Sequence, residues 1–164
     1  MTNQPTTPIR ATDDEARSLS RSLLAKARYA ALAVLKPDDQ TPMVSRIALT
    51  TTSDGAPLTL ISHLSGHTAA LRADPSCSLL VGEPEDRGDP LTHPRLTIQA
   101  TALFIQKGEP GHDALRSHYL ERQPKAKLYI DFADFCFVRF DIREAFLNGG
   151  FGRAYNLNAD DLAM

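Results

Sequence analysis

The fold is decided by residues 43–83, which read MVSRIALTTTSDGAPLTLISHLSGHTAALRADPSCSLLVGE. Apolar runs lie on either side of the turn-forming pair Asp54-Gly55, and this pattern predicts a hairpin. A short helical stretch, closed by Asp-Pro, and a buried apolar strand come next. The elements expected here are strands over Val44–Thr52 and Pro57–Ser62, a helix over Gly66–Ala73 and a strand over Ser78–Gly82.

Polar residues gather where the second of these strands passes into the helix. A helix start offers free backbone N–H groups and the positive end of the helix dipole, and both suit a phosphate. The expected hairpin would bring Arg46 alongside as a planar, bidentate cation. We therefore expect an anion site made of Ser45, Arg46, Ser62, Ser65, His67 and Thr68.

Each of these residues also has a plainer interpretation. A strand arginine such as Arg46 often pairs with an acid on the same face. Serine is a common helix cap, and because a cap and a phosphate ligand share one geometry, both interpretations of Ser62 and Ser65 stand together. His67, in the first helical turn, can equally be a solvated side chain.

The rest of the chain also divides into strands and helices. Residues 95–102 alternate polar and apolar side chains, which is the period of a half-buried strand. Thr12 followed by Glu15 is a capping-box pattern for a first helix. Residues 83–93 are rich in Gly, Pro and acids and predict a solvated loop. The other expected elements are a first helix to about Arg28, a strand over Ala30–Leu35, a helix over Pro110–Arg122, and strands over Phe135–Ile142 and Ala145–Phe151.

Composition and charge argue against several classes of protein. The 164 residues carry a formal net charge of −2 with scattered Lys and Arg, so no nucleic-acid partner is expected. No stretch is apolar enough for a membrane span, and the start of the chain lacks a signal-peptide pattern. We therefore expect a cytoplasmic protein with no membrane partner. Neither the five His residues nor Cys77 and Cys136 show metal-ligand spacing, so no metal site is expected.

The domain organisation follows from length and pattern. Residues 1–11 are mostly polar and contain prolines, so we expect a flexible N-terminal arm, followed by a single domain over residues 12–164. About six strands joined mostly by hairpins, with three helices at the ends and edges, indicate the α+β class. Antiparallel strands with such connections commonly close into a small barrel.

Several short motifs together resemble the pyridoxamine 5′-phosphate oxidase-like split barrels. In order they are Arg46-Ile47-Ala48-Leu49, Gly55, Ile61-Ser62, Ser65-Gly66-His67 and Asp74-Pro75. In that family a strand arginine precedes an apolar triplet, and a short polar motif opens the next helix. The pair His67-Thr68 and the late run Asn148–Ala154 are closest to the haem-utilisation (HugZ-like) branch. The similarity extends from about Leu19 to Ala154.

The resemblance implies an antiparallel split β-barrel with flanking helices, the FMN-binding split barrel, which forms a homodimer with FMN at the interface. The phosphate ligands that it implies are Arg46, Ser62, Ser65, His67 and Thr68, and Ser45 and Ile47 would lie near the isoalloxazine. Arg95, with Thr97 or Gln99, would face the ring system. The far wall would be shaped by Gly150 to Arg153, although the run Gly149–Gly152 reads equally well as a turn.

The function that the resemblance implies is an FMN-dependent oxidoreductase acting on an unidentified small molecule, with no side chain assigned a catalytic role. Two alternatives stay open: a haem-binding or haem-degrading protein of the HugZ-like type, and a non-catalytic flavin-binding protein. The chain has no Trp and no Arg-x-His-like substrate motif, which argues against pyridoxamine-phosphate oxidase activity itself. It ends at Met164, so we do not expect haem coordination from the extra C-terminal domain that many haem-utilisation relatives carry.

Overall fold

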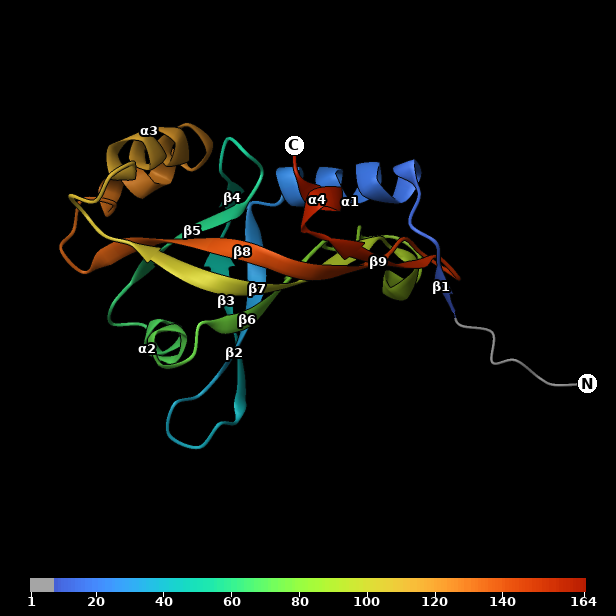
Figure 1. Cartoon of the computed structure of the whole chain (residues 1–164), viewed down its shortest axis with the longest axis horizontal. Coiled ribbons are helices and arrows are strands. Elements are labelled where there is room, and N and C mark those ends of the chain that lie inside the picture. Colours follow the sequence, from blue (N-terminus) through green and yellow to red (C-terminus); the bar gives the residue numbers. More distant parts are fainter. Residues whose placement is uncertain (1–7) are drawn as a thin grey trace, which may run out of the picture.

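The computed structural model describes residues 8–164, and most of the expected N-terminal arm lies outside them. The elements run along the chain as drawn in Figure 1. The strands are β1 (Ile9–Arg10), β2 (Tyr29–Leu35), β3 (Pro42–Ala48), β4 (Thr50–Thr51), β5 (Pro57–Ser62), β6 (Ser76–Val81), β7 (Arg95–Ile105), β8 (Phe135–Asn148) and β9 (Ala154–Asn158). The helices are α1 (Asp14–Lys26), α2 (Gly66–Ala73), α3 (His112–Arg122) and α4 (Ala159–Leu162), with 3-10 turns η1 (Pro90–Thr92) and η2 (Pro124–Leu128).

The strands form one mixed sheet in the order β1-β9-β8-β7-β6-β2-β3. The long strand β8 pairs with β7 along one edge, while β5 and β9 share its other edge. Among the described strands β1 and β9 form the one parallel pair. The α+β class and the largely antiparallel sheet are thus confirmed. The sheet is open rather than closed, because no hydrogen-bonded ladder joins β3 to β5 in residues 8–164.

The expected hairpin of Val44–Thr52 with Pro57–Ser62 is wrong over most of its length. β3 pairs with β2 from end to end, around the turn that follows Leu35, and only Thr50 and Thr51 pair with β5. The cause is Leu49, which is fully buried and whose backbone N–H donates to the carbonyl of Arg28 at 2.9 Å. The chain therefore turns at Leu49, and Arg46 lies beside Ala31 of β2 instead of beside β5.

The N-terminal region also differs from the expected pattern. Asp13, not Thr12, caps α1, because its carboxylate accepts the N–H of Ala16 at 2.8 Å. The hydroxyl of Thr12 instead donates to the carbonyl of Asn156 on β9. Ile9 and Arg10, placed by the sequence in the flexible arm, pair with β9. This end of the chain is therefore tied to the sheet from Ile9 onward.

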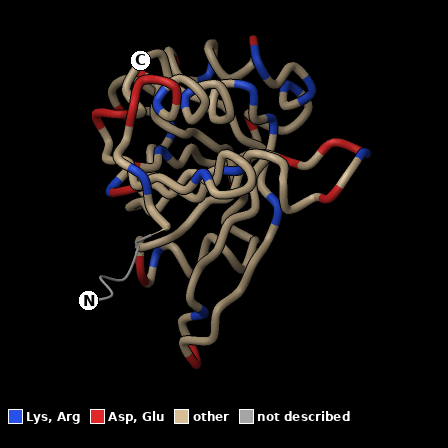
Figure 2. The backbone as a smooth tube through the Cα atoms, turned by 90° about the vertical axis from the view of Figure 1, so that its right-hand side faces the viewer, with Lys and Arg blue, Asp and Glu red and all other residues tan. Residues whose placement is uncertain are grey.

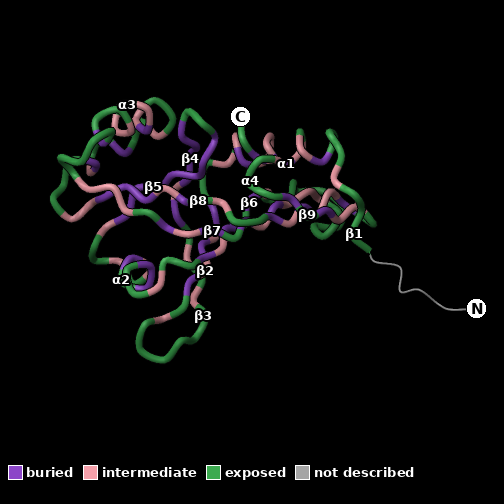
Figure 3. Tube along the Cα trace, in the orientation of Figure 1, coloured by how far each residue is buried: buried purple, intermediate pink, exposed green. Residues whose placement is uncertain are grey.

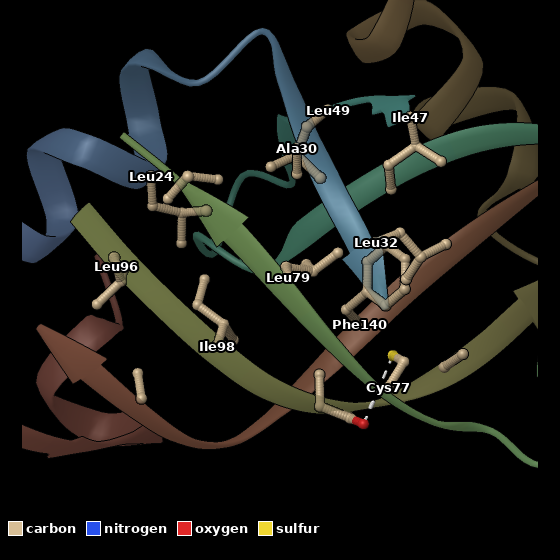
Figure 4. Close-up of a cluster of buried hydrophobic side chains, with 14 of the residues drawn as sticks. Leu24, Ala30, Leu32, Ile47, Leu49, Cys77, Leu79, Leu96, Ile98 and Phe140 are labelled. Atoms are coloured by element: carbon tan, nitrogen blue, oxygen red, sulfur yellow. Dashed lines mark hydrogen bonds between the residues drawn. The ribbon is translucent and has the colours of Figure 1, made fainter. Parts of the chain in front are cut away.

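The core has two parts. The larger cluster lies between the sheet and helices α1 and α2, and Figure 4 shows its side chains pointing toward one another from β2, β6, β7 and β8. The smaller one packs α3 and η2 against β5 and the first half of β8, around Tyr119 and Phe137. Figure 3 shows the buried trace concentrated along the central strands, with loops and the outer sides of helices exposed. No helix within residues 8–164 has the length and apolar character that crossing a membrane requires.

Candidate functional site

One face of the sheet, here called the outer face, points away from the main core. The strand register places Arg46 beside Ala31, Ala31 beside Leu80, and Leu80 beside Thr97. Because residues two apart on a strand share a face, this row extends to its neighbours on each strand. The outer face of β3, β2, β6 and β7 includes Tyr29, Ala31, Ala33, Leu35, Val44, Arg46, Ser78, Leu80, Arg95, Thr97 and Gln99.

At one end of the outer face lies a concavity, here called the Tyr29 cleft. It consists of two adjoining cavities of about 350 Å³ and about 200 Å³, which share Tyr29, Gly82 and Glu83. The larger is walled by the last turns of α1, including the apolar Leu19 and Leu23. The smaller continues along β2 and β6; its other lining residues are Ala31, Leu80, Val81, Pro84, Pro90 and Arg95. The cleft is therefore long and largely apolar.

Cations surround this apolar cleft. Lys26 and Arg28 line the α1 side, and Arg95 lines the β6–β7 side. The guanidinium of Arg46 lies 5.2 Å from the centre of the Tyr29 ring, a cation–π contact. Glu83 is the carboxylate of this lining, so the net charge around the cleft is positive. Over the whole molecule the two signs are interspersed, as Figure 2 shows, which makes this local excess distinct.

The wall of the cleft depends on a close approach of two backbone segments at Gly82. Its φ of +98° belongs to the left-handed region, and a Cβ there would lie 2.6 Å from the carbonyl oxygen of Pro94. This contact folds the loop after β6 back onto the start of β7. Arg95 then donates to the carbonyl of Leu91 at 2.9 Å, which fixes its guanidinium at the edge of the cleft.

The expected anion site at the start of α2 has a different construction. The hydroxyl of Ser45 and Nδ1 of His67 form a hydrogen bond of 3.0 Å, so β3 and α2 do meet there. The other ring nitrogen, Nε2 of His67, is buried and has no partner within the described residues. Burial lowers the pKa of His67 below its usual value, because the charged imidazolium loses solvation.

The remaining polar residues of this junction are engaged with the protein itself. Ser62 donates to the carboxylate of Asp134 at 2.5 Å and accepts the N–H of Leu64. The buried hydroxyl of Thr68 donates to the carbonyl of Ser62 at 2.6 Å. Ser65 is the N-cap residue of α2, but its side chain makes no capping hydrogen bond. These contacts fix the strand–helix turn, and Asp134 places a negative charge beside Ser62.

Arg46 is separated from this group. Successive side chains of a strand point to opposite faces, so Ser45 and Ile47 face inward while Arg46 lies on the outer face. Ile47 is buried in the main core, and Ser45 reaches His67. The structure thus brings Ser45, Ser62, Ser65, His67 and Thr68 together and places Arg46 with Arg95, Thr97 and Gln99 on the other side of the sheet.

The glycine-rich segment after β8 forms the turn into β9. The N–H of Gly149 donates to the carbonyl of Arg153 at 2.7 Å, and the N–H of Arg153 donates back to Gly150. Gly150 has a φ of +114°, and a Cβ there would lie 3.0 Å from the carbonyl oxygen of Thr92. The Arg153 guanidinium pairs with Glu15 on α1 at 2.5 Å, and Phe151 is 95% exposed. Gly150 therefore packs against the loop at Thr92 and Arg153 ties the turn to α1, and neither residue lines the Tyr29 cleft.

A separate cavity of about 350 Å³ lies away from the Tyr29 cleft, between β8, α4 and the turn before β5. Its polar lining includes the carboxylates of Asp54, Asp141 and Asp160, and Arg139 is paired with the first two. The Arg139 contact lowers the pKa of Asp54, so this carboxylate is ionised at neutral pH. A cavity lined in this way disfavours an anionic ligand. No group of three or more metal-binding side chains is found in residues 8–164.

The architecture defines the chain as an α+β split-barrel protein with its exposed sheet face beside a basic, apolar cleft. Residues 11–163 match the model of the CREG β-barrel family, which spans nearly the whole chain. The chain therefore belongs to this family.

Three relatives extend the comparison. The chain is 39% identical to the chloroplastic non-canonical haem oxygenase HOZ of Arabidopsis thaliana over 101 residues. The matched stretch makes up 61% of this chain and 29% of that protein. A haem-binding protein from Mycobacterium smegmatis has a TM-score of 0.80 and 25% identity, covering 94% of this chain and 61% of that one. HutZ, a haem storage protein from Vibrio cholerae, has a TM-score of 0.70 and 21% identity, and the match covers 86% of this chain and 97% of HutZ. At this identity the comparison shows the shared fold alone.

These relatives confirm the resemblance to the HugZ-like branch and correct the expected cofactor. The expectation of FMN is wrong, because the relatives from Arabidopsis and Mycobacterium are named for haem and not for a flavin. The chain spans less than a third of the first of these proteins and about three fifths of the second.

Proposed function

We propose that this protein binds haem in the Tyr29 cleft. The observation that carries the proposal is the combination of apolar walls with cations at the rim. Haem is a flat, apolar macrocycle with two carboxylate side chains, so it needs apolar surface for its ring and cations for its propionates. The acidic cavity beside Asp54 offers the opposite charge.

The residues of the cleft divide into two roles. Leu19, Leu23 and Leu80 supply apolar surface against which a porphyrin face can pack. Arg46 and Arg95 supply planar guanidinium groups that pair well with carboxylates, and they approach the cleft from β3 and β7. Of the residues that the sequence predicted for the site, Arg46 and Arg95 are the two that we keep as ligand-binding.

We assign a structural role to the polar residues at the start of α2. Their hydrogen bonds join β3, β5 and α2, as in the contacts of Ser45 with His67 and of Ser62 with Asp134. This framework lies on the side of β3 opposite Arg46, and the β2–β3 ladder places Arg46 beside Ala31.

Haem degradation is the enzymatic form of the same proposal, and the 39% identity to a protein named as a haem oxygenase favours it. Bound haem would supply the redox-active iron. The chain would contribute the apolar wall that limits water and the cations that fix the orientation of the macrocycle. Loss of the haem absorption bands in the presence of a reductant and oxygen, with release of iron, would identify this activity. Stable bands under those conditions would leave haem binding as the function.

We also propose that the protein forms a homodimer through the outer face. Val44 is 66% exposed and Leu80 44% exposed, and Ala31 and Ala33 lie between them on β2. Exposed apolar side chains gathered on one sheet face favour burial against a partner. The Tyr29 cleft opens on the same face, so a second copy would cover its open side.

The proposed binding is tested by titrating the purified protein with hemin and following the Soret band. We expect saturable binding, with an affinity reduced about tenfold or more in the double variant Arg46→Ala, Arg95→Ala, because each lost charge-assisted pair is worth about 1 kcal/mol or more. Arg116→Ala is the matched control, since Arg116 lies on α3, away from the cleft, and pairs with Asp131. Equal affinities in all three proteins would contradict the assignment of the cleft.

A further inference from the structure

We infer that Tyr29 is the side chain that ligates the haem iron, through its phenolate oxygen. The inference rests on the proposed haem binding and goes beyond it by naming the ligand. Haem iron in proteins is held by His, Cys, Met or Tyr side chains. Among residues 8–164, Tyr29 is the one side chain of these four types that lines the cleft.

The histidines within the described residues are all placed elsewhere. His67 faces Ser45 on the other side of the sheet, and His63 contacts Arg72. Both ring nitrogens of His93 are engaged within its own loop, with the N–H of Glu85 and the carbonyl of Arg87. His112 and His118 belong to α3, where the first packs against Phe137 and the second contacts the carbonyl of Thr51. None of the five reaches the cleft.

The other candidate ligand atoms are buried or distant. Cys77 and Cys136 are both buried in the main core, and the Cys77 thiol donates to the carbonyl of Ala100, as Figure 4 shows. Burial raises the pKa of both thiols, which disfavours the thiolate that ligates iron. Of the other tyrosines, Tyr119 and Tyr155 are buried and Tyr129 packs against Phe135. The described methionines, Met43 and Met164, lie beside Gly66 and Gly55.

Tyr29 itself has the placement that a ligand requires. It is 39% exposed and belongs to the lining of both cavities, so it lies at the centre of the cleft. Its hydroxyl makes no hydrogen bond to any residue in the described part of the chain. The Arg46 guanidinium lies 5.2 Å from the centre of its ring, so a positive charge stands near the oxygen that would bond to iron.

The bonding step is a simple exchange. The phenol releases its proton to solvent, and the oxygen lone pair forms a bond to ferric iron in place of a water molecule. No oxidation state changes, so no reductant or oxidant is needed. The anionic oxygen favours ferric over ferrous iron, so the bound haem should have a low reduction potential.

The test uses the 164-residue chain loaded with ferric haem, studied by resonance Raman and visible spectroscopy. The wild-type complex should show phenolate ring vibrations on excitation in the phenolate-to-iron charge-transfer band. Tyr29→Phe should lose these vibrations, and Tyr29→His should give the spectrum of an imidazole-ligated haem. Tyr129→Phe is the control, because Tyr129 lies outside the cleft and should leave the spectrum unchanged.

The outcomes separate the ligand assignment from the proposed function. If the wild type binds haem saturably and Tyr29→Phe keeps the same spectrum, the ligand assignment is overturned while haem binding stands. If the wild type shows no saturable binding, the proposed function fails, and the ligand assignment fails with it. A circular dichroism spectrum equal to that of the wild type shows that each variant is folded.

Discussion

His67 shows how burial changes the chemistry of a single side chain at the junction of β3 and α2. The pKa of His67 is lowered in the folded state, so the unfolded chain takes up the proton first as the pH falls through about 6.5. Stability should therefore drop below this pH. In His67→Gln this part of the drop disappears, since glutamine does not titrate and retains a partner for Ser45.

The measurement is urea unfolding at pH 7.5 and pH 5.5. We expect the free energy of unfolding to fall more in the wild type than in His67→Gln between these values. His63→Gln serves as the control, because His63 is exposed. An identical pH dependence in wild type and His67→Gln would show that His67 titrates equally in both states.

The two cysteines give a second prediction at the scale of the residue. Burial raises the pKa of Cys77 to about 12, and the thiol of Cys136 is fully buried with a raised pKa. Because the thiolate is the reactive form, neither should react with iodoacetamide in the native protein at pH 8. Mass spectrometry should find both alkylated only after unfolding in urea. Rapid modification of the native protein would mean that the sheet opens around Cys77.

At the scale of the element, the turn at Gly82 connects β6 to the loop that borders the cleft. Gly82→Ala should lower the free energy of unfolding by roughly 3 kcal/mol, from the strain of a positive φ and from the close contact with Pro94. Gly108→Ala is the matched variant, since Gly108 has a φ of +84° and open space around it. It should cost only about 1–2 kcal/mol. Equal losses in thermal unfolding would show that the contact at Gly82 relaxes freely.

How far the elements could be predicted depended on whether their pattern is local. The alternation after Arg95 and the end of α2 at Asp74 follow from nearby residues, and both were found where expected. β9 was missed because Ala154–Asn158 is only five residues long and follows directly on the glycine-rich turn, although its alternating buried Tyr155 and Leu157 carry the period of a strand. It is held by pairing with β8 and β1. The partner of β3 was also missed, because the break at Leu49 arises from a hydrogen bond to Arg28, which the sequence pattern does not show.

The candidate site was harder to predict than the elements. Arg46 and Arg95 were identified, but Tyr29, Lys26 and Gly82 were not, because these residues meet only when α1, β2 and β6 pack together. The phosphate site expected from the sequence placed Arg46 and Ser45 together, although neighbouring residues of a strand face opposite sides of the sheet. The alternation of side chains along β3 was the signal that would have separated them.

At the scale of the whole molecule, self-association tests the outer face. Val44→Asp should shift the protein from dimer to monomer at micromolar concentration, because it places a charge in an apolar interface. Val44 does not line the Tyr29 cleft, so this variant leaves the direct contacts to haem intact. Leu128→Asp is the control, since Leu128 is exposed in η2. A wild type that sediments as a monomer would contradict the dimer without touching the assignment of the cleft.

The central claim is that a porphyrin occupies the Tyr29 cleft, and the most direct test is to locate it by NMR. Gallium protoporphyrin IX is diamagnetic and carries the same ring and propionates as haem. On its addition, the backbone amide resonances of Ala31, Leu80 and Gly82 should shift, while those of α3 stay in place. Shifts confined to the first turn of α2, or none at saturating porphyrin, would contradict the account.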